Sequence, residues 1–98
     1  MEPIVACLTA LGDTPAAVAA ALRAAGVTGR RESNSFYNPV VRYLNRTLVI
    51  GGRLEIGADG GRLYLFREGS SHSAALPPAV AGFVVEFRRG DHPELEQA

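Results

Sequence analysis

Lysine is missing from this sequence of 98 residues, and cysteine occurs once. All ten basic side chains are arginine, which together with the many alanines indicates a GC-rich bacterial genome. Because Cys7 stands alone, an internal disulfide is excluded, and a secreted domain of this size usually depends on such bonds. Without lysine the chain also lacks the residue that reaches the phosphates in a P-loop. We therefore expect a small bacterial protein of the cytoplasm.

Long hydrophobic runs are also lacking. A membrane-spanning helix needs about 20 apolar residues, and the apolar stretches here are far shorter. The segment before Cys7 contains Glu2 and no basic residue, so it does not resemble a secretion signal. The hydrophobic fraction of 47% and the charged fraction of 20% are typical of a globular chain. We expect one domain over residues 1–98, with an acidic tail, 91–98, that frays.

Residues that hold metals or perform catalysis are scarce. The two histidines, His72 and His92, have no metal-ligand spacing with Cys7, whereas a zinc site needs about four ligands. The serines around His72 lie in a Gly/Ser-rich segment, which supplies no rigid elbow for a nucleophile. We therefore predict no metal, no cofactor and no enzymatic activity.

Proline at first helical positions, capping residues and apolar spacing predict four helices. Their expected ranges are 3–11, 15–25, 39–45 and 78–89. The last one has the clearest stripe, with Val80, Phe83, Val84 and Phe87 at the i, i+3, i+4, i+7 spacing of one helix face. The intervening segments 27–37 and 69–75 are expected to be a polar loop and a flexible connection.

The segment 53–67 predicts a β-hairpin around a two-residue turn at Asp59-Gly60. This turn places Leu54 opposite Leu65 and Ile56 opposite Leu63, so that four aliphatic side chains share one face. The residues 48–50 are a candidate third strand. The fold class is therefore α+β, with about four helices packed with a β-hairpin or a small antiparallel sheet. The expected core comprises Leu8, Leu11, Val18, Leu22, Val41, Leu44, Leu54, Ile56, Leu63, Leu65, Val80, Phe83, Val84 and Phe87.

The other face of this hairpin is a candidate protein interface. It carries Arg53, Arg62, Tyr64 and Phe66, and aromatic residues with arginine are the usual anchors of protein interfaces. Two readings stay open, because either the face is exposed or it is covered by the last helix or the 27–37 loop.

The middle of the chain is basic and is a candidate nucleic-acid site. Residues 23–67 carry eight arginines against three acids, a net charge of +5. The candidate phosphate contacts are Arg30, Arg31, Arg42 and Arg46. Three helices followed by a hairpin resemble a winged helix, with 39–45 as the recognition helix. The loop 27–37, however, is longer than the usual turn of a helix-turn-helix.

Three segments resemble small proteins of GC-rich bacteria such as actinobacteria. They are TPAAVAAALRAAGVTGRR, NPVVRYL and LPPAVAGFVVEFRRGDHPEL, and together they cover about half of the chain. The group is characterised by a CP-hydrophobic-x-RYL box and by a C-terminal LPxxVxxFVxxFDxGxYPxL-like segment. This sequence has Asn38 in place of the cysteine and His92 in place of an aromatic residue. The resemblance implies a bacterial accessory protein and no particular chemistry.

These observations favour a small protein-interaction or regulatory module, which assembles with a protein partner or with itself as a subunit of a larger assembly. The alternative is a winged-helix-like accessory domain that binds nucleic acid through its arginine-rich middle.

Overall fold

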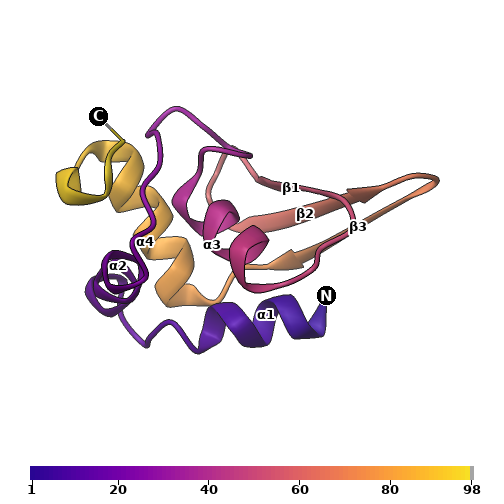
Figure 1. Ribbon diagram of the computed structural model, residues 1–98, viewed down its shortest axis with the longest axis horizontal. Helices are drawn as coiled ribbons and strands as arrows, with labels where there is room; N and C mark the ends of the chain where they lie inside the picture. The colour runs from indigo at the N-terminus through magenta and orange to yellow at the C-terminus, as the bar shows by residue number, and fades with distance from the viewer. Residues whose placement is uncertain (98) are drawn as a thin grey trace.

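Four helices and one antiparallel sheet follow one another in the computed structural model, which describes residues 1–97 (Figure 1). The elements are α1 (Glu2–Thr9), α2 (Pro15–Ala24), α3 (Pro39–Thr47), β1 (Arg53–Ile56), β2 (Arg62–Arg67), β3 (Ser70–Ala75), α4 (Pro78–Arg89) and a short 3₁₀ helix, η1 (Pro93–Leu95). The strands are ordered β1-β2-β3. The predicted α+β class is confirmed.

Local chemistry explains where the helices begin and end. The Thr14 hydroxyl accepts a hydrogen bond from the Ala17 N–H at 3.1 Å and caps α2. The Asn38 carboxamide oxygen accepts from the Val40 N–H at 2.9 Å and caps α3. At the other end of α4, Gly90 takes a φ of 88°, the left-handed conformation that glycine adopts without steric cost. The helix ranges predicted from the sequence agree with the structure to within two residues at each end.

The core forms where the helices meet the inner face of the sheet. The α2 and α4 helices pack against each other, and Phe83 and Phe87 of α4 are buried with ring centroids 5.8 Å apart. All fourteen residues of the predicted core are buried. Burial of such side chains contributes about 1.5–3 kcal/mol each. The hydrophobic spacing of the sequence therefore located the core correctly.

The hairpin of β1 and β2 has the predicted register. Leu54 lies opposite Leu65 and Ile56 opposite Leu63, which places the four aliphatic side chains on the inner face. The turn itself differs from the prediction. The Gly60 N–H donates to the Gly57 carbonyl at 2.9 Å, and only Gly60 has a positive φ, whereas a type I′ turn needs two. Pairing of the aliphatic side chains therefore fixes the register without that turn type.

The third strand is not where we predicted it. Residues 48–50 are irregular, and the predicted flexible connection 69–75 forms β3 instead. A two-residue turn, Glu68-Gly69, folds the chain back onto β2, with Gly69 at a φ of 77°. Because β3 lies at the edge of the sheet and is almost wholly exposed, its sequence carries no hydrophobic alternation that would have revealed it.

The acidic tail does not fray as we expected over residues 91–97. Leu95 is 1% exposed and belongs to the core. Backbone hydrogen bonds join the tail to the 27–37 loop, because the Gly29 N–H donates to Leu95 at 2.9 Å and the Gln97 N–H donates to Gly29 at 2.7 Å. Burial of one leucine together with this short parallel bridge stabilises the tail. Ala98 lies outside the described residues.

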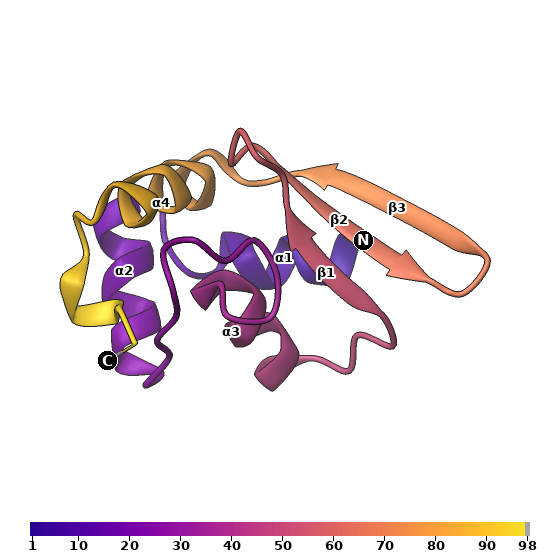
Figure 2. The ribbon, with the colours of Figure 1, turned by 90° about the horizontal axis from the view of Figure 1, so that it is seen from above.

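The α1 and α3 helices lie on one side of the sheet, α2 and α4 pack together at the end of the strands, and the β2–β3 hairpin projects beyond the helices. Figure 1 shows α1 and α3 below the strands, and Figure 2 shows the hairpin extending away from α2 and α4. Within residues 1–97, no helix combines the length and the apolar character required to cross a membrane. The opposite face of the sheet is thus left without a helical layer.

Candidate functional site

The outer face of the sheet carries an aromatic ladder. The rings of Tyr64 and Phe66 stack with centroids 6.3 Å apart and planes inclined by 14°. The Arg53 guanidinium lies over the Phe66 ring, 5.0 Å from its centroid, from the neighbouring strand. Stacked rings topped by a guanidinium form a flat, amphipathic surface of the kind that anchors protein interfaces.

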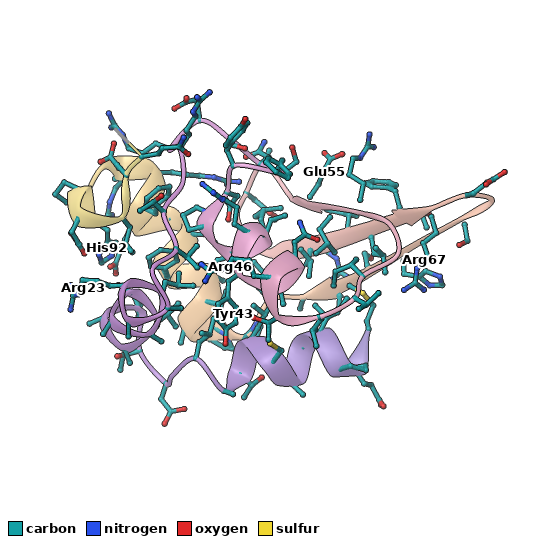
Figure 3. The ribbon with its side chains drawn as sticks, in the orientation of Figure 1. Arg23, Tyr43, Arg46, Glu55, Arg67 and His92 are labelled. Carbon is teal, nitrogen blue, oxygen red and sulfur yellow. The ribbon has the colours of Figure 1, made fainter. Side chains whose placement is uncertain are left out.

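This outer face is open to solvent. Phe66 is 36% exposed, Arg53 and Arg62 are exposed, and Tyr64 is half-buried. Figure 3 shows Glu55 on this upper side of the sheet and Arg67 on the opposite side, with the helices. Of the two alternatives that the sequence left open, an exposed outer face is the one found in the structure.

Neither the last helix nor the 27–37 loop covers the outer face, because each contacts only the border of the sheet. From α4, Arg88 donates to the carbonyls of Ala58 at 3.0 Å and Gly57 at 3.1 Å and to the Asn34 side chain at 2.6 Å. Partial burial of the Arg88 guanidinium lowers its pKa by desolvation, an effect that the nearby Asp59 carboxylate opposes. Arg88 thus fixes the turn at one end of the hairpin and leaves the aromatic ladder uncovered.

The charged groups of the face have local partners. Arg53 and Glu55 form an ion pair at 3.0 Å, and Arg62 donates to the Ser73 hydroxyl of β3 at 3.1 Å. Exposed pairs of this kind contribute about 0–1 kcal/mol. These contacts connect Arg53 to its own strand and Arg62 to β3.

The two edges of the sheet differ. At the β1 edge, the Ile56 N–H donates to the Asn34 carbonyl at 2.6 Å, so the 27–37 loop pairs with the end of this edge. At the β3 edge, the Leu76 N–H donates to Gly61 at 2.9 Å, and antiparallel pairing alternates from there. Ser70, His72 and Ala74 therefore point their backbone groups at β2. The backbone groups of 71, 73 and 75 point outward.

The open β3 edge lacks the devices that normally protect an edge strand. Such devices are charged side chains, proline, a bulge or a covering loop. The strand SSHSAA contains no proline, and its pairing with β2 is continuous over all six residues. The side chains of Ser71, Ser73 and Ala75 lie on the outer face, next to the aromatic ladder. The sequence analysis missed this feature, although the Glu68-Gly69 pair after a β-rich segment was a turn signal.

Three of the four candidate nucleic-acid arginines lie near the docked tail. The Arg30 guanidinium lies 4.5 Å from the Tyr37 ring centroid, and the Arg31 Nε pairs with Glu96 at 2.9 Å. Arg42 donates to the Thr28 carbonyl at 3.2 Å and to the Gln97 side chain at 3.0 Å. Two of these arginines are therefore engaged in holding the tail.

Arg46 lies one turn beyond Arg42 on α3 and is exposed (Figure 3). The segment 25–38 separates α2 from α3, and α2 makes its main contact with α4. The chain therefore lacks the tight turn between α2 and α3 that a helix-turn-helix requires.

The side chains that could act as metal ligands or catalytic groups are dispersed over the structure. Within residues 1–97, no three His, Cys, Asp or Glu side chains gather as metal ligands. His72 lies on the inner face of β3, whereas Ser71 and Ser73 lie on the outer face. His92 pairs with Glu86 at 2.9 Å, and its ring lies 5.2 Å from that of Phe83. This histidine thus packs on the core beside Phe83.

Comparison of the chain with protein-family models, with curated proteins and with solved structures gives no match. The resemblance to small proteins of GC-rich bacteria stays a prediction, and the function is inferred from geometry.

Proposed function

We propose that this chain is a small interaction module that assembles with a second copy of itself through the open β3 edge and the outer sheet face. The observation that carries the proposal is the contrast between the two edges. The 27–37 loop satisfies the Ile56 N–H at the β1 edge, whereas the β3 backbone groups at 71, 73 and 75 point outward. Unpaired edge groups form hydrogen bonds with another strand at little steric cost.

The geometry of β3 suits pairing with its own copy. In an antiparallel pair centred on Ser73, that residue lies opposite Ser73 of the second copy, and Ser71 lies opposite Ala75. These side chains are small, so two sheets can join without a clash on the outer face. The net formal charge of zero removes long-range repulsion between the copies. A two-fold contact of this kind closes on itself and does not propagate into a fibre.

The aromatic ladder adds apolar area to this contact. Tyr64 lies opposite Ser73, and Phe66 lies opposite Ser71, so both rings lie one strand in from the seam, with only these small serine side chains between. An edge contact with two rings per copy is smaller than the roughly 1,200–2,000 Å² of a stable interface. We therefore expect a reversible dimer with a dissociation constant in the micromolar range.

Sedimentation velocity over a concentration series tests the proposal. The wild-type chain is expected to dimerise, and Tyr64→Ala with Phe66→Ala is expected to weaken the dimer while leaving the melting temperature nearly unchanged. The matched control is Leu63→Ala with Leu65→Ala on the opposite face of the same strand, which should destabilise the fold by about 2–5 kcal/mol per site. A wild-type chain that stays monomeric at all concentrations contradicts the proposal. A large loss of stability in the Tyr64/Phe66 variant would do so too.

We further propose that the module acts in the cytoplasm of a bacterium and without catalysis. The single cysteine, Cys7, and the absence of lysine support the first part. The dispersal of its histidines and carboxylates supports the second.

Nucleic-acid binding is the second candidate, and Arg30 and Arg46 are the observation that favours it, because both are exposed on the basic middle of the chain. Binding of this kind falls steeply with salt concentration. Substitution of Arg30, Arg31, Arg42 and Arg46 together should abolish it. A gel-shift assay at low salt checks this candidate, and no shift of DNA or RNA at micromolar protein retires it.

A further inference from the structure

A hollow lies on the inner face of the sheet, where the β2–β3 hairpin reaches past the beginning of α1. Its volume is about 260 Å³. The floor is apolar, since Ile4, Ile50 and Leu65 line it and are 6%, 6% and 2% exposed. Residues 48–50, which line the hollow on one side, are irregular and do not continue the sheet, and Met1 and Pro3 line it from the first turn of α1. It is therefore separate from the outer face used in the proposed function.

Two basic side chains stand at one side of this hollow. Arg67 of β2 and His72 of β3 both line it and are exposed. They share the inner face, because Arg67 follows Leu65 by two residues and His72 lies opposite Leu65. Figure 3 shows Arg67 on the α1 side of the sheet, away from Glu55.

Arg67 is held in place by a hydrogen bond, and its guanidinium has further N–H donors. One terminal nitrogen donates to the Ile50 carbonyl at 2.8 Å, which fixes the guanidinium beside the 48–50 segment. In the part of the chain that the structure describes, neither Arg67 nor His72 belongs to an ion pair. A guanidinium has five N–H donors, so most of them remain for a ligand. The hollow thus combines an apolar floor with an unpaired, oriented cation.

Val49 marks the opening of the hollow. Its side chain is fully exposed, at 101%, although its neighbour Ile50 is buried in the core. An aliphatic side chain beside an apolar cleft gains free energy when a ligand excludes water from it. Val49 therefore supplies apolar contact area that the folded chain by itself does not use.

We propose that this hollow binds a free aliphatic carboxylate of medium chain length. The alkyl chain lies on Ile4, Ile50 and Leu65, and the carboxylate accepts hydrogen bonds from the Arg67 guanidinium beside His72. Arg–carboxylate pairing is directional and frequently bidentate. A carboxylate is therefore the group whose charge and geometry complement the Arg67 guanidinium in the hollow. The volume is slightly below the roughly 300–1,000 Å³ of drug-sized sites, so the site takes a short chain and excludes a long one.

Titration of the isotope-labelled full chain with octanoate, below its micelle concentration, tests the proposal by NMR. Saturable shifts are expected at the amides of Ile50, Leu65 and His72. Octan-1-ol has the same chain length and no charge, and it should bind about tenfold more weakly or worse. Shifts centred elsewhere, no saturable binding, or equal affinity for the alcohol would each overturn the proposal.

Two variants identify the contacts. Arg67→Gln keeps a donor for the Ile50 carbonyl and removes the charge, and it should weaken octanoate binding about tenfold or more. Arg89→Gln lies on α4, outside the hollow, and removes an exposed pair with Asp91, so it should bind octanoate as the wild type does. Equal affinity in the two variants would contradict the assignment of the carboxylate to Arg67. Dimerisation, measured separately, does not enter either comparison.

Discussion

At the scale of single residues, Asn38 shows how a polar side chain can be required inside the core. It is 1% exposed, and its carboxamide caps α3 while its Nδ2 donates to the Ser33 carbonyl at 3.3 Å. An apolar side chain at this position would have no oxygen with which to cap the helix. Asn38 therefore connects the 27–37 loop to the beginning of α3.

Asn38→Ala is expected to cost about 1–3 kcal/mol, because it removes the cap and leaves buried backbone groups without partners. Thr14→Ala removes the exposed cap of α2 and should cost about 1 kcal/mol. Urea denaturation of both variants measures the difference. A smaller loss for Asn38→Ala than for Thr14→Ala would show that the burial of the side chain contributes nothing.

At the scale of elements, hydrophobic spacing predicted the parts of the fold that bury one face. It located the four helices and aligned β1 with β2, because Leu54, Ile56, Leu63 and Leu65 can share the core in only one register. It failed for β3, because the side chains of this strand are exposed to solvent and form no hydrophobic pattern. Only backbone hydrogen bonds with β2 define the strand. The candidate interface residues of β2 could therefore be named from the sequence, whereas the open edge beside them could not.

The tail was missed for a related reason. Its acidic composition is typical of a solvated end, and the single buried residue, Leu95, is too little to form a pattern. The hydrogen bonds with Gly29 connect positions far apart in the sequence, which local reasoning cannot foresee.

Leu95→Ala tests whether the tail is part of the fold. Loss of a fully buried leucine should destabilise the chain by about 2–5 kcal/mol in urea denaturation. The matched control is the neighbouring Glu94→Ala, which removes surface contacts with Arg23 at 3.7 Å and with His92 at 3.5 Å and should change stability by less than about 1 kcal/mol. Equal stability of the two variants would indicate that the tail frays after all.

Proline at the β3 edge tests the pairing directly. The Ser73 N–H points away from β2, so Ser73→Pro removes a donor of the open edge without breaking the β2–β3 ladder, and edge strands tolerate proline. We expect a monomer of nearly unchanged melting temperature, and we expect Ser73→Ala to dimerise as the wild type does. Dimerisation of Ser73→Pro in sedimentation velocity would place the contact elsewhere.

At the scale of the whole molecule, one part of the fold stabilises the sheet and another part stays exposed to solvent. The α1 and α3 helices lie on one side of the sheet, α2 and α4 pack together at the end of the strands, and Arg88 secures the hairpin turn. The other face, together with the β3 edge, extends beyond the helices into solvent (Figure 2). This asymmetry is the basis of the account, since the helices stabilise a sheet whose free edge and outer face are available for assembly.

Hydrogen exchange of the β3 amides at several protein concentrations tests that claim most directly. We expect the Ser71, Ser73 and Ala75 amides to become protected as concentration rises, because they then donate to a second copy. The amides of His72 and Ala74, which already face β2, should exchange at unchanged rates. Exchange at Ser71, Ser73 and Ala75 that does not depend on concentration would contradict assembly through this edge.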